Sequence, residues 1–117
     1  MPAAEALIQT ALLGEAIESG PALVFVADED MRYIAVNQYA CEALGFTRDE
    51  LLGMRVTDVA QGAGAPAEYD EMLVRGSRHG TSVLTRKDGT TVEFFYRAAS
   101  TTVAGLSFFV SIGFLGD

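Results

Sequence analysis

The side chains most used in catalysis are scarce in this chain of 117 residues, which contains one histidine, His79, and one cysteine, Cys41. Catalysis by a nucleophile needs a base within reach, and a zinc site needs several Cys or His ligands. His79 lies between Arg78 and Gly80, in a polar stretch typical of a solvated loop beside the start of a strand. We therefore expect neither an enzyme nor a metal site. The single cysteine also excludes an internal disulfide.

The sequence disfavours binding of phosphate groups, nucleic acid and membranes as well. The loop at residues 62–64 contains glycines but lacks the Lys-Ser/Thr pair and the preceding strand of a phosphate-binding loop. The net charge of −8 would repel nucleic acid and anionic membranes. The apolar run at residues 22–27 is far too short to span a bilayer, and the N-terminus lacks the pattern of a signal peptide. These features favour a cytoplasmic domain that contacts neither nucleic acid nor membrane.

Residues 36–53 have the pattern of two short helices packed behind a strand, and this segment is the flap. Asn37 follows an apolar run and can cap the first helix with its side-chain oxygen. Ala40 and Leu44 recur at helical spacing and predict the side of the helix that faces the core. Gly45 then supplies the left-handed residue at which such a helix ends.

The second helix of the flap begins with a capping box. Thr47 and Glu50 are three residues apart, so each side chain can bond to the backbone N–H of the other residue. Leu51 and Leu52 then point back towards the core, and Gly53 ends this turn. The flap is therefore predicted to be a compact pair of helices over a sheet.

Five segments have the composition and alternation of β-strands. They are residues 22–27, 32–36, 82–86, 90–99 and 106–114. Residues 28–30 and the pair Asp88-Gly89 have the composition of tight turns, so each connects two strands of a hairpin. The short helices fall between the second and third strands, which is the arrangement of an α+β domain. We expect a five-stranded antiparallel sheet with short helices on one face.

Residues 3–19 are rich in Ala, Leu, Ile and Glu and have the pattern of an amphipathic helix with a wide apolar face. Both faces of the last two strands are apolar too. We assign Phe94 and Phe108 to the core side, and Phe95 and Phe109 to the outer side. A small domain rarely leaves such aromatic side chains exposed, so the N-terminal helix or a second copy of the chain should cover them. This pattern favours a homodimer in which the N-terminal helices and the outer sheet faces meet.

The order of these elements, together with matching residues, resembles the PAS sensor domain family. The matching positions are Asp28, Asn37, Ala40, the tripeptide Leu44-Gly45-Phe46, residues 49–53 and residues 86–90. The resemblance covers residues 20–117 and leaves residues 1–19 as an N-terminal helix for capping or dimerisation. It implies a non-catalytic sensory and dimerisation module that passes a change in its pocket through the last strand to an output domain beyond Asp117. A kinase, cyclase, phosphatase or DNA-binding domain would each fit as that output.

The resemblance also bears on cofactors. A haem-binding member would have a histidine in the helix that Pro66 opens and Gly76 ends, but His79 lies three residues beyond this helix. A photoadduct-forming flavin domain would have a cysteine in a G-R-N-C-like stretch, where this chain has residues 53–56 without one. Cys41 lies elsewhere, in the first flap helix, and is expected to be a small buried hydrophobe. We expect neither haem nor a flavin photoadduct. The identity of any cofactor stays open, and flavin bound without that chemistry is included.

In the family fold, the space between the flap helices and the concave sheet face holds either side chains or a ligand. The resemblance places in this space Phe25, Tyr39, Leu44, Val56, Val59, Tyr69, Met72, Val83, Phe94, Tyr96 and Phe108. These residues suit a small apolar or aromatic ligand, for which Tyr69 or Tyr96 would provide one polar anchor. The alternative is a filled core in a domain that only mediates protein contacts. The family also implies an ion pair from Glu50 to Lys87 or Arg86 across the mouth of the pocket.

Overall fold

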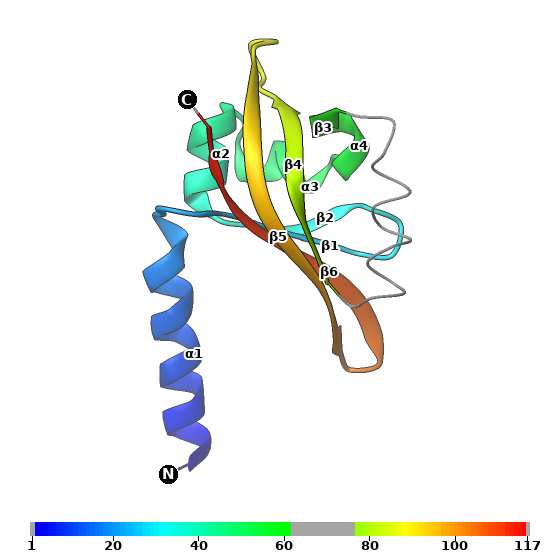
Figure 1. The fold of residues 1–117 in the computed structure, drawn as a ribbon. Coiled ribbons are helices and arrows are strands. Elements are labelled where there is room, and N and C mark those ends of the chain that lie inside the picture. Colours follow the sequence, from blue (N-terminus) through cyan, green and yellow to red (C-terminus); the bar gives the residue numbers. More distant parts are fainter. Residues whose placement is uncertain (1, 62–76, 117) are drawn as a thin grey trace.

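The structure is a computed structural model, and it describes residues 2–61 and 77–116. In chain order its elements are α1 (Pro2–Glu18), β1 (Leu23–Ala27), β2 (Tyr33–Val36), α2 (Gln38–Leu44), α3 (Arg48–Leu52), α4 (Val56–Val59), β3 (Ala60–Gln61), β4 (Ser77–Thr85), β5 (Thr91–Val103) and β6 (Leu106–Leu115). Figure 1 shows one curved sheet with α2, α3 and α4 gathered beside it, while α1 projects from the body. The helix predicted between Pro66 and Gly76 lies outside the described residues.

The described strands form one antiparallel sheet in the order β2-β1-β6-β5-β4-β3. Five of them are the predicted strands, and β3 is a further strand of two residues that pairs with β4. The predicted α+β fold, with its antiparallel sheet, short helices and N-terminal helix, is therefore confirmed. Because β6 pairs with β1, the last strand of the chain lies beside the first.

Strand β4 begins earlier than the sequence indicated. It pairs with β5 along its whole length, and its first residues include the polar stretch expected to be a loop. His79 therefore lies within the strand, opposite Arg97 of β5, although its side chain is exposed as expected. The expectation of a loop was wrong because pairing with a long neighbouring strand extends β4 through residues whose own composition does not favour it.

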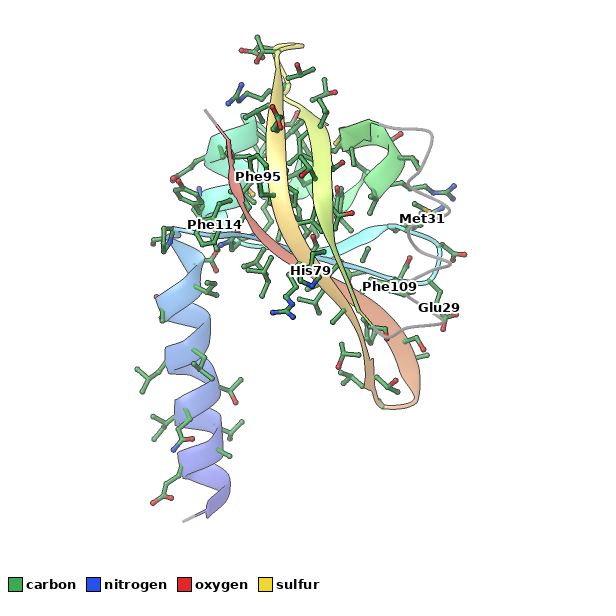
Figure 2. The ribbon with its side chains drawn as sticks, in the orientation of Figure 1. Glu29, Met31, His79, Phe95, Phe109 and Phe114 are labelled. Carbon is green, nitrogen blue, oxygen red and sulfur yellow. The ribbon has the colours of Figure 1, made fainter. Side chains whose placement is uncertain are left out.

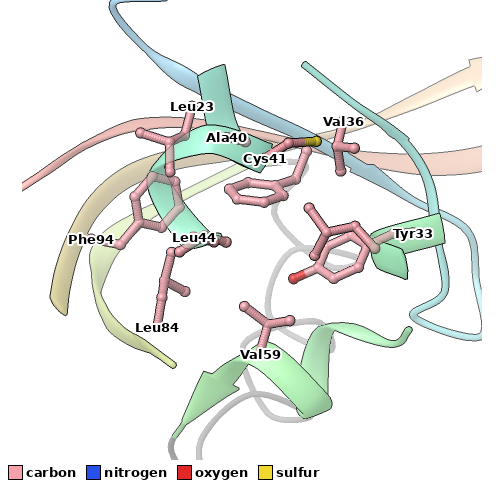
Figure 3. Packing of buried hydrophobic residues seen from close by; sticks show 11 residues of the cluster. Leu23, Tyr33, Val36, Ala40, Cys41, Leu44, Val59, Leu84 and Phe94 are labelled. Carbon is pink, nitrogen blue, oxygen red and sulfur yellow. The ribbon is translucent and has the colours of Figure 1, made fainter. Parts of the chain in front are cut away.

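The core lies between the sheet and helices α2, α3 and α4 (Figure 3). On β5 the residues that alternate towards the core are Val92, Phe94, Tyr96 and Ala98, as predicted. The ring of Phe94 meets the ring of Phe25 edge-on with centroids 5.6 Å apart, and it stacks on Tyr96 at the same distance. Burial of these apolar side chains supplies most of the driving force for folding.

The predicted faces of β6 are exchanged in the structure. Phe109 is 4% exposed and belongs to the core side, so its neighbour Phe108 points to the outer side together with Phe95. Alternation could not decide the direction because phenylalanines occur on both faces of β6. Gly113 explains which face of β6 lies towards the core. A Cβ atom at this core-facing position would lie 2.7 Å from Cε1 of Phe94, so the position has no room for a side chain.

Helix α1 projects away from the sheet. All side chains at residues 5–16 are exposed, including Leu12 at 63% and Leu13 at 72%. In the described part of this single chain α1 does not lie over the outer face of the sheet, and Phe95 and Phe114 remain exposed there (Figure 2). The expectation that α1 covers this face within the same chain is therefore wrong, whereas cover by a second copy stays a prediction. Among the described residues, no helix combines the length and the apolar character needed to cross a membrane.

Candidate functional site

Helix α2 begins at the residue that was predicted to cap it. Asn37 has the extended conformation of an N-cap (φ −83°, ψ 163°), and its side-chain oxygen accepts the backbone N–H of Ala40 at 3.1 Å. The helix ends at Gly45, whose φ of 79° is left-handed and whose N–H donates to the carbonyl of Cys41 at 2.9 Å. Between these ends Ala40, Cys41 and Leu44 are buried against the core. The two caps therefore fix which side of α2 faces the sheet.

The predicted capping box starts α3 and also prepares an ion pair. The N–H of Glu50 donates to Oγ1 of Thr47 at 3.1 Å, and the N–H of Thr47 donates to Oε1 of Glu50 at 2.9 Å. The other carboxylate oxygen of Glu50 accepts a bond from Nζ of Lys87 at 2.6 Å. The hydrogen bond from Lys87, followed by that from the Thr47 backbone, holds the pKa of Glu50 below its ordinary value because both favour the ionised carboxylate.

The hairpin between β4 and β5 holds the flap through two further contacts. The backbone N–H of Lys87 donates to the carbonyl of Leu44 at 2.9 Å, and Nε of Arg86 donates to the carbonyl of Ala43 at 3.1 Å. These carbonyls belong to the last turn of α2, where helical partners are missing. The predicted link between flap and hairpin is thus present: Lys87 forms the ion pair with Glu50, and Arg86 binds the end of α2.

Nine of the eleven residues predicted for the ligand pocket lie in the described part of the chain, while Tyr69 and Met72 lie outside it. Seven of the nine belong to the apolar cluster between flap and sheet, namely Phe25, Leu44, Val59 and Phe94, which are buried, and Tyr39, Val56 and Tyr96, which pack against them. Phe108 and Val83 do not belong to this cluster as the structure describes it. Phe108 is on the outer face of β6, and the place expected for Val83 is taken by its neighbour Leu84, which is 3% exposed.

Tyr33 is a member of the cluster that the sequence did not indicate. Its ring centroid lies 5.5 Å from that of Phe25, and its hydroxyl points towards the middle of the cluster (Figure 3). Tyr33 and Val36 are both buried although strict alternation would place them on opposite faces of β2. The pairing of β1 with β2 shifts by one residue beside Ala27, and such a bulge redirects side chains. No turn residue in the sequence marks this bulge, so periodicity missed Tyr33.

A model of the PAS domain family matches residues 21–113 of the chain. The chain belongs to the PAS domain family. Its fold is similar to that of a PAS domain from a two-component sensor histidine kinase, with a TM-score of 0.83 at 12% identity over 95% of this chain and 99% of the other. The PAS domain of an HTR-like protein from Haloarcula marismortui has a TM-score of 0.79 at 22% identity over 98% of each chain. The LOV domain of a blue-light activated histidine kinase from Erythrobacter litoralis has a TM-score of 0.68 at 20% identity over 82% of this chain and 96% of the other. A comparison with curated proteins gave no match.

This PAS domain also has an open groove of about 390 Å³ along α2 and α3. Arg48 and Lys87 line it, and each of them is paired with a glutamate carboxylate, Glu18 and Glu50 respectively. Cys41 also lines the groove, and its burial raises the pKa of the thiol. Apart from Cys41 and Phe46, the residues of this groove differ from those of the apolar cluster, so the groove is not the predicted ligand pocket. Among the described residues, no three His, Cys, Asp or Glu side chains are grouped as metal ligands.

Proposed function

We propose that this PAS domain is a non-catalytic sensory and dimerisation module of a larger signalling protein. It binds a small apolar or aromatic ligand between the flap helices and the sheet, and it passes the resulting change through β6 to an output domain. The observation that carries this proposal is the buried apolar cluster under α2, α3 and α4, together with the Lys87–Glu50 pair that joins α3 to the β4–β5 hairpin. The origin of similar folds in sensor histidine kinases supports a role in signalling.

The proposed ligand site is the apolar cluster of the flap and sheet, with Leu84 in place of Val83 and without Phe108. Ligand pockets are mostly apolar and use a few polar groups to orient the ligand. In this cluster the hydroxyl groups of Tyr33 and Tyr96 come from sheet strands, and that of Tyr39 comes from the flap helix α2. A ligand bound through Tyr33 or Tyr96 would be anchored on the sheet while the flap helices adjust around it.

The proposed dimer surfaces are α1 and the outer face of the sheet. Phe95 and Phe114 lie directly opposite each other on β5 and β6 and are 48% and 56% exposed (Figure 2). Ile112 lies on the same face, and Leu12 and Leu13 are exposed on α1. Contiguous exposed apolar surface of this kind marks sites of protein contact. A second copy of the chain would cover these side chains by placing helix beside helix and sheet beside sheet.

Native mass spectrometry of the purified chain tests the ligand, since a bound small molecule adds its mass to the folded protein. A thermal-shift screen with flavin mononucleotide, haem, fatty acids and small aromatic compounds complements it. We expect a retained mass, or a clear rise in Tm with an apolar or aromatic compound, because binding to the folded state alone stabilises it. For the dimer, sedimentation velocity over a range of concentrations should show a species of twice the chain mass. A monomer at high concentration would contradict this part of the proposal.

The alternative is a PAS domain that mediates protein contacts through a filled core and binds no ligand. The close ring contacts of Phe94 with both Phe25 and Tyr96 favour this alternative, since they are those of an ordinary packed core. The same screen separates the two functions. If no compound is retained and none raises Tm, the domain functions through protein contacts at its surface and binds no ligand.

A further inference from the structure

The side chain of Asn37 forms four hydrogen bonds that join three parts of the fold. Its Oδ1 accepts the backbone N–H groups of Val24 at 3.0 Å and Ala40 at 3.1 Å, and its Nδ2 donates to the carbonyls of Ile17 at 2.7 Å and Ala22 at 2.9 Å. Asn37 is 6% exposed and is the one buried polar residue among those the structure describes. The oxygen of this amide caps α2 and binds β1 at Val24, while the nitrogen holds the end of α1 and the residue that precedes β1.

A second set of contacts lies beside the first. The carboxylate of Glu18, the last residue of α1, accepts the backbone N–H of Gln38 and pairs with the guanidinium of Arg48. Nε of Arg48 also donates to the carbonyl of Val36 at 3.2 Å. Gln38 is the first residue of α2 and Arg48 is the first residue of α3. The end of α1 is therefore bonded to the beginnings of both flap helices.

The rest of α1 has a different environment. All side chains at residues 5–16 are exposed, and Ile17 and Glu18, which follow them, are partly buried. In Figure 1 the helix meets the body at its C-terminal end and extends away from it. The orientation of α1 relative to the sheet is thus set at its last turn, where Asn37 and Glu18 make their contacts.

We propose that Asn37 and the Glu18–Arg48 pair are positioning residues that couple the end of α1 to the flap. This inference rests on the proposed sensory function, for which it supplies the route between the ligand site and the dimerisation helix. Ala40, Cys41 and Leu44 of α2 pack into the apolar cluster, so a change in the cluster displaces α2. Because the same amide group caps α2 and holds the carbonyl of Ile17, that displacement reaches α1 directly. Coupling of this kind is reciprocal: a change at α1 alters the flap to the same extent.

Hydrogen–deuterium exchange tests the coupling on the full 117-residue chain and needs no ligand. Glu18→Ala removes the contacts on the α1 side, and Arg48→Ala removes them on the flap side. We expect Glu18→Ala to speed amide exchange at residues 38–52, and Arg48→Ala to speed it at residues 15–22, each by about fivefold, as for the loss of one net hydrogen bond. Glu15→Ala is the matched control, since it removes another exposed carboxylate from α1, and it should change neither segment.

Asn37→Asp is the sharpest variant, because aspartate keeps both acceptor contacts with Val24 and Ala40 but loses the two donor contacts with Ile17 and Ala22. It should speed exchange at residues 15–22 while the protection of the Gly45 amide, which donates to Cys41, is kept. If this variant does not fold, the Glu18 and Arg48 variants decide. Exchange that rises only on the side of each substitution would overturn the coupling. A monomeric or ligand-free chain would contradict the proposed function and leave this result standing.

Discussion

Nζ of Lys87 lies 2.6 Å from Oε2 of Glu50, and this pair joins the hairpin between β4 and β5 to the first turn of α3. The two residues are 37 positions apart in the chain. Glu50 is held on its other side by the Thr47 backbone, so the carboxylate is already oriented when Lys87 reaches it. The pair therefore positions the flap over the sheet and makes only a minor contribution to stability, as partly exposed pairs generally do.

Replacing Glu50 with Gln should leave the fold intact and loosen the flap. Glutamine can still accept the N–H of Thr47, but it loses the charge that pairs with Lys87. We expect amide exchange at residues 40–60 to rise by no more than about fivefold, in line with the modest strength of such pairs. Asp49→Asn is a suitable control, since it neutralises the adjacent carboxylate. Unchanged exchange through residues 40–60 would count against a positioning role.

The contribution of Glu50 should disappear in acid. Its pKa is lowered in the folded state, chiefly by the hydrogen bond from Lys87. The stabilisation is therefore complete above the pKa of the unfolded chain and is lost as pH falls through the lower pKa of the folded state. Thermal unfolding of the wild type and of Glu50→Gln, followed from neutral pH to about pH 3, should show Tm values that differ at neutral pH and converge in acid. A difference that stays constant with pH would contradict this assignment.

Replacing Gly113 with Ala should destabilise the domain strongly. The added Cβ would lie 2.7 Å from Cε1 of Phe94 and 2.8 Å from Cα of Tyr96, so both β5 and its aromatic side chains must shift. Overpacking of this kind costs roughly 1–3 kcal/mol of unfolding free energy, and backbone contacts place this site at the upper end. Gly14→Ala is the control, because nothing lies within 4 Å of a Cβ there, and denaturant unfolding should show no loss of stability.

Shortening a side chain to alanine should cost more stability on one face of β4 than on the other. Leu84 is buried in the cluster, so Leu84→Ala should cost about 2–5 kcal/mol of unfolding free energy. Val83 is only partly buried and lies outside the cluster as described, so Val83→Ala should cost about 1 kcal/mol or less. Urea unfolding curves with equal slopes would give both values. A larger loss at Val83 would mean that the sequence-based assignment of this strand was right after all.

A polar substitution on the outer face should weaken the proposed dimer without unfolding the chain. Phe114 is 56% exposed, so Phe114→Ser removes little buried surface from a single chain. Sedimentation velocity should show at least a tenfold weaker dimer, which corresponds to about 1.4 kcal/mol of association free energy. Leu52→Ser, at an exposed apolar position on α3 and so away from the outer face of the sheet, should leave the dimer unchanged. Equal effects of the two substitutions would indicate non-specific association.

Local signals predicted the caps of the flap helices, because a cap depends only on neighbours along the chain. Asn37, Gly45 and the Thr47–Glu50 box all lie where the sequence placed them. The expectation that Leu52 faces the core together with Leu51 was wrong, since Leu52 is 39% exposed. The resemblance to the PAS family supplied the Lys87–Glu50 pair and most of the apolar cluster, since these join segments that local patterns cannot relate.

The errors came from features that depend on distant contacts. The direction of β6 is set by the room available beside Phe94, and alternation contains no information about it. Tyr33 is buried because a bulge shifts the register of β2 against β1, and no residue in the sequence indicates that bulge. The position of α1 could not be predicted because the sequence pattern does not say which surface its exposed apolar residues contact.

The attachment of α1 at one end also has a purely geometric consequence. A helix of 17 residues is about 25 Å long at 1.5 Å per residue. A tilt of only about 10° at its base would carry its free end through roughly 4 Å, as for any rigid rod of that length. A small tilt at the C-terminal end of α1 therefore becomes a larger displacement at its N-terminal end. A spectroscopic label near the N-terminal end would detect tilts that are too small to detect at the base of the helix.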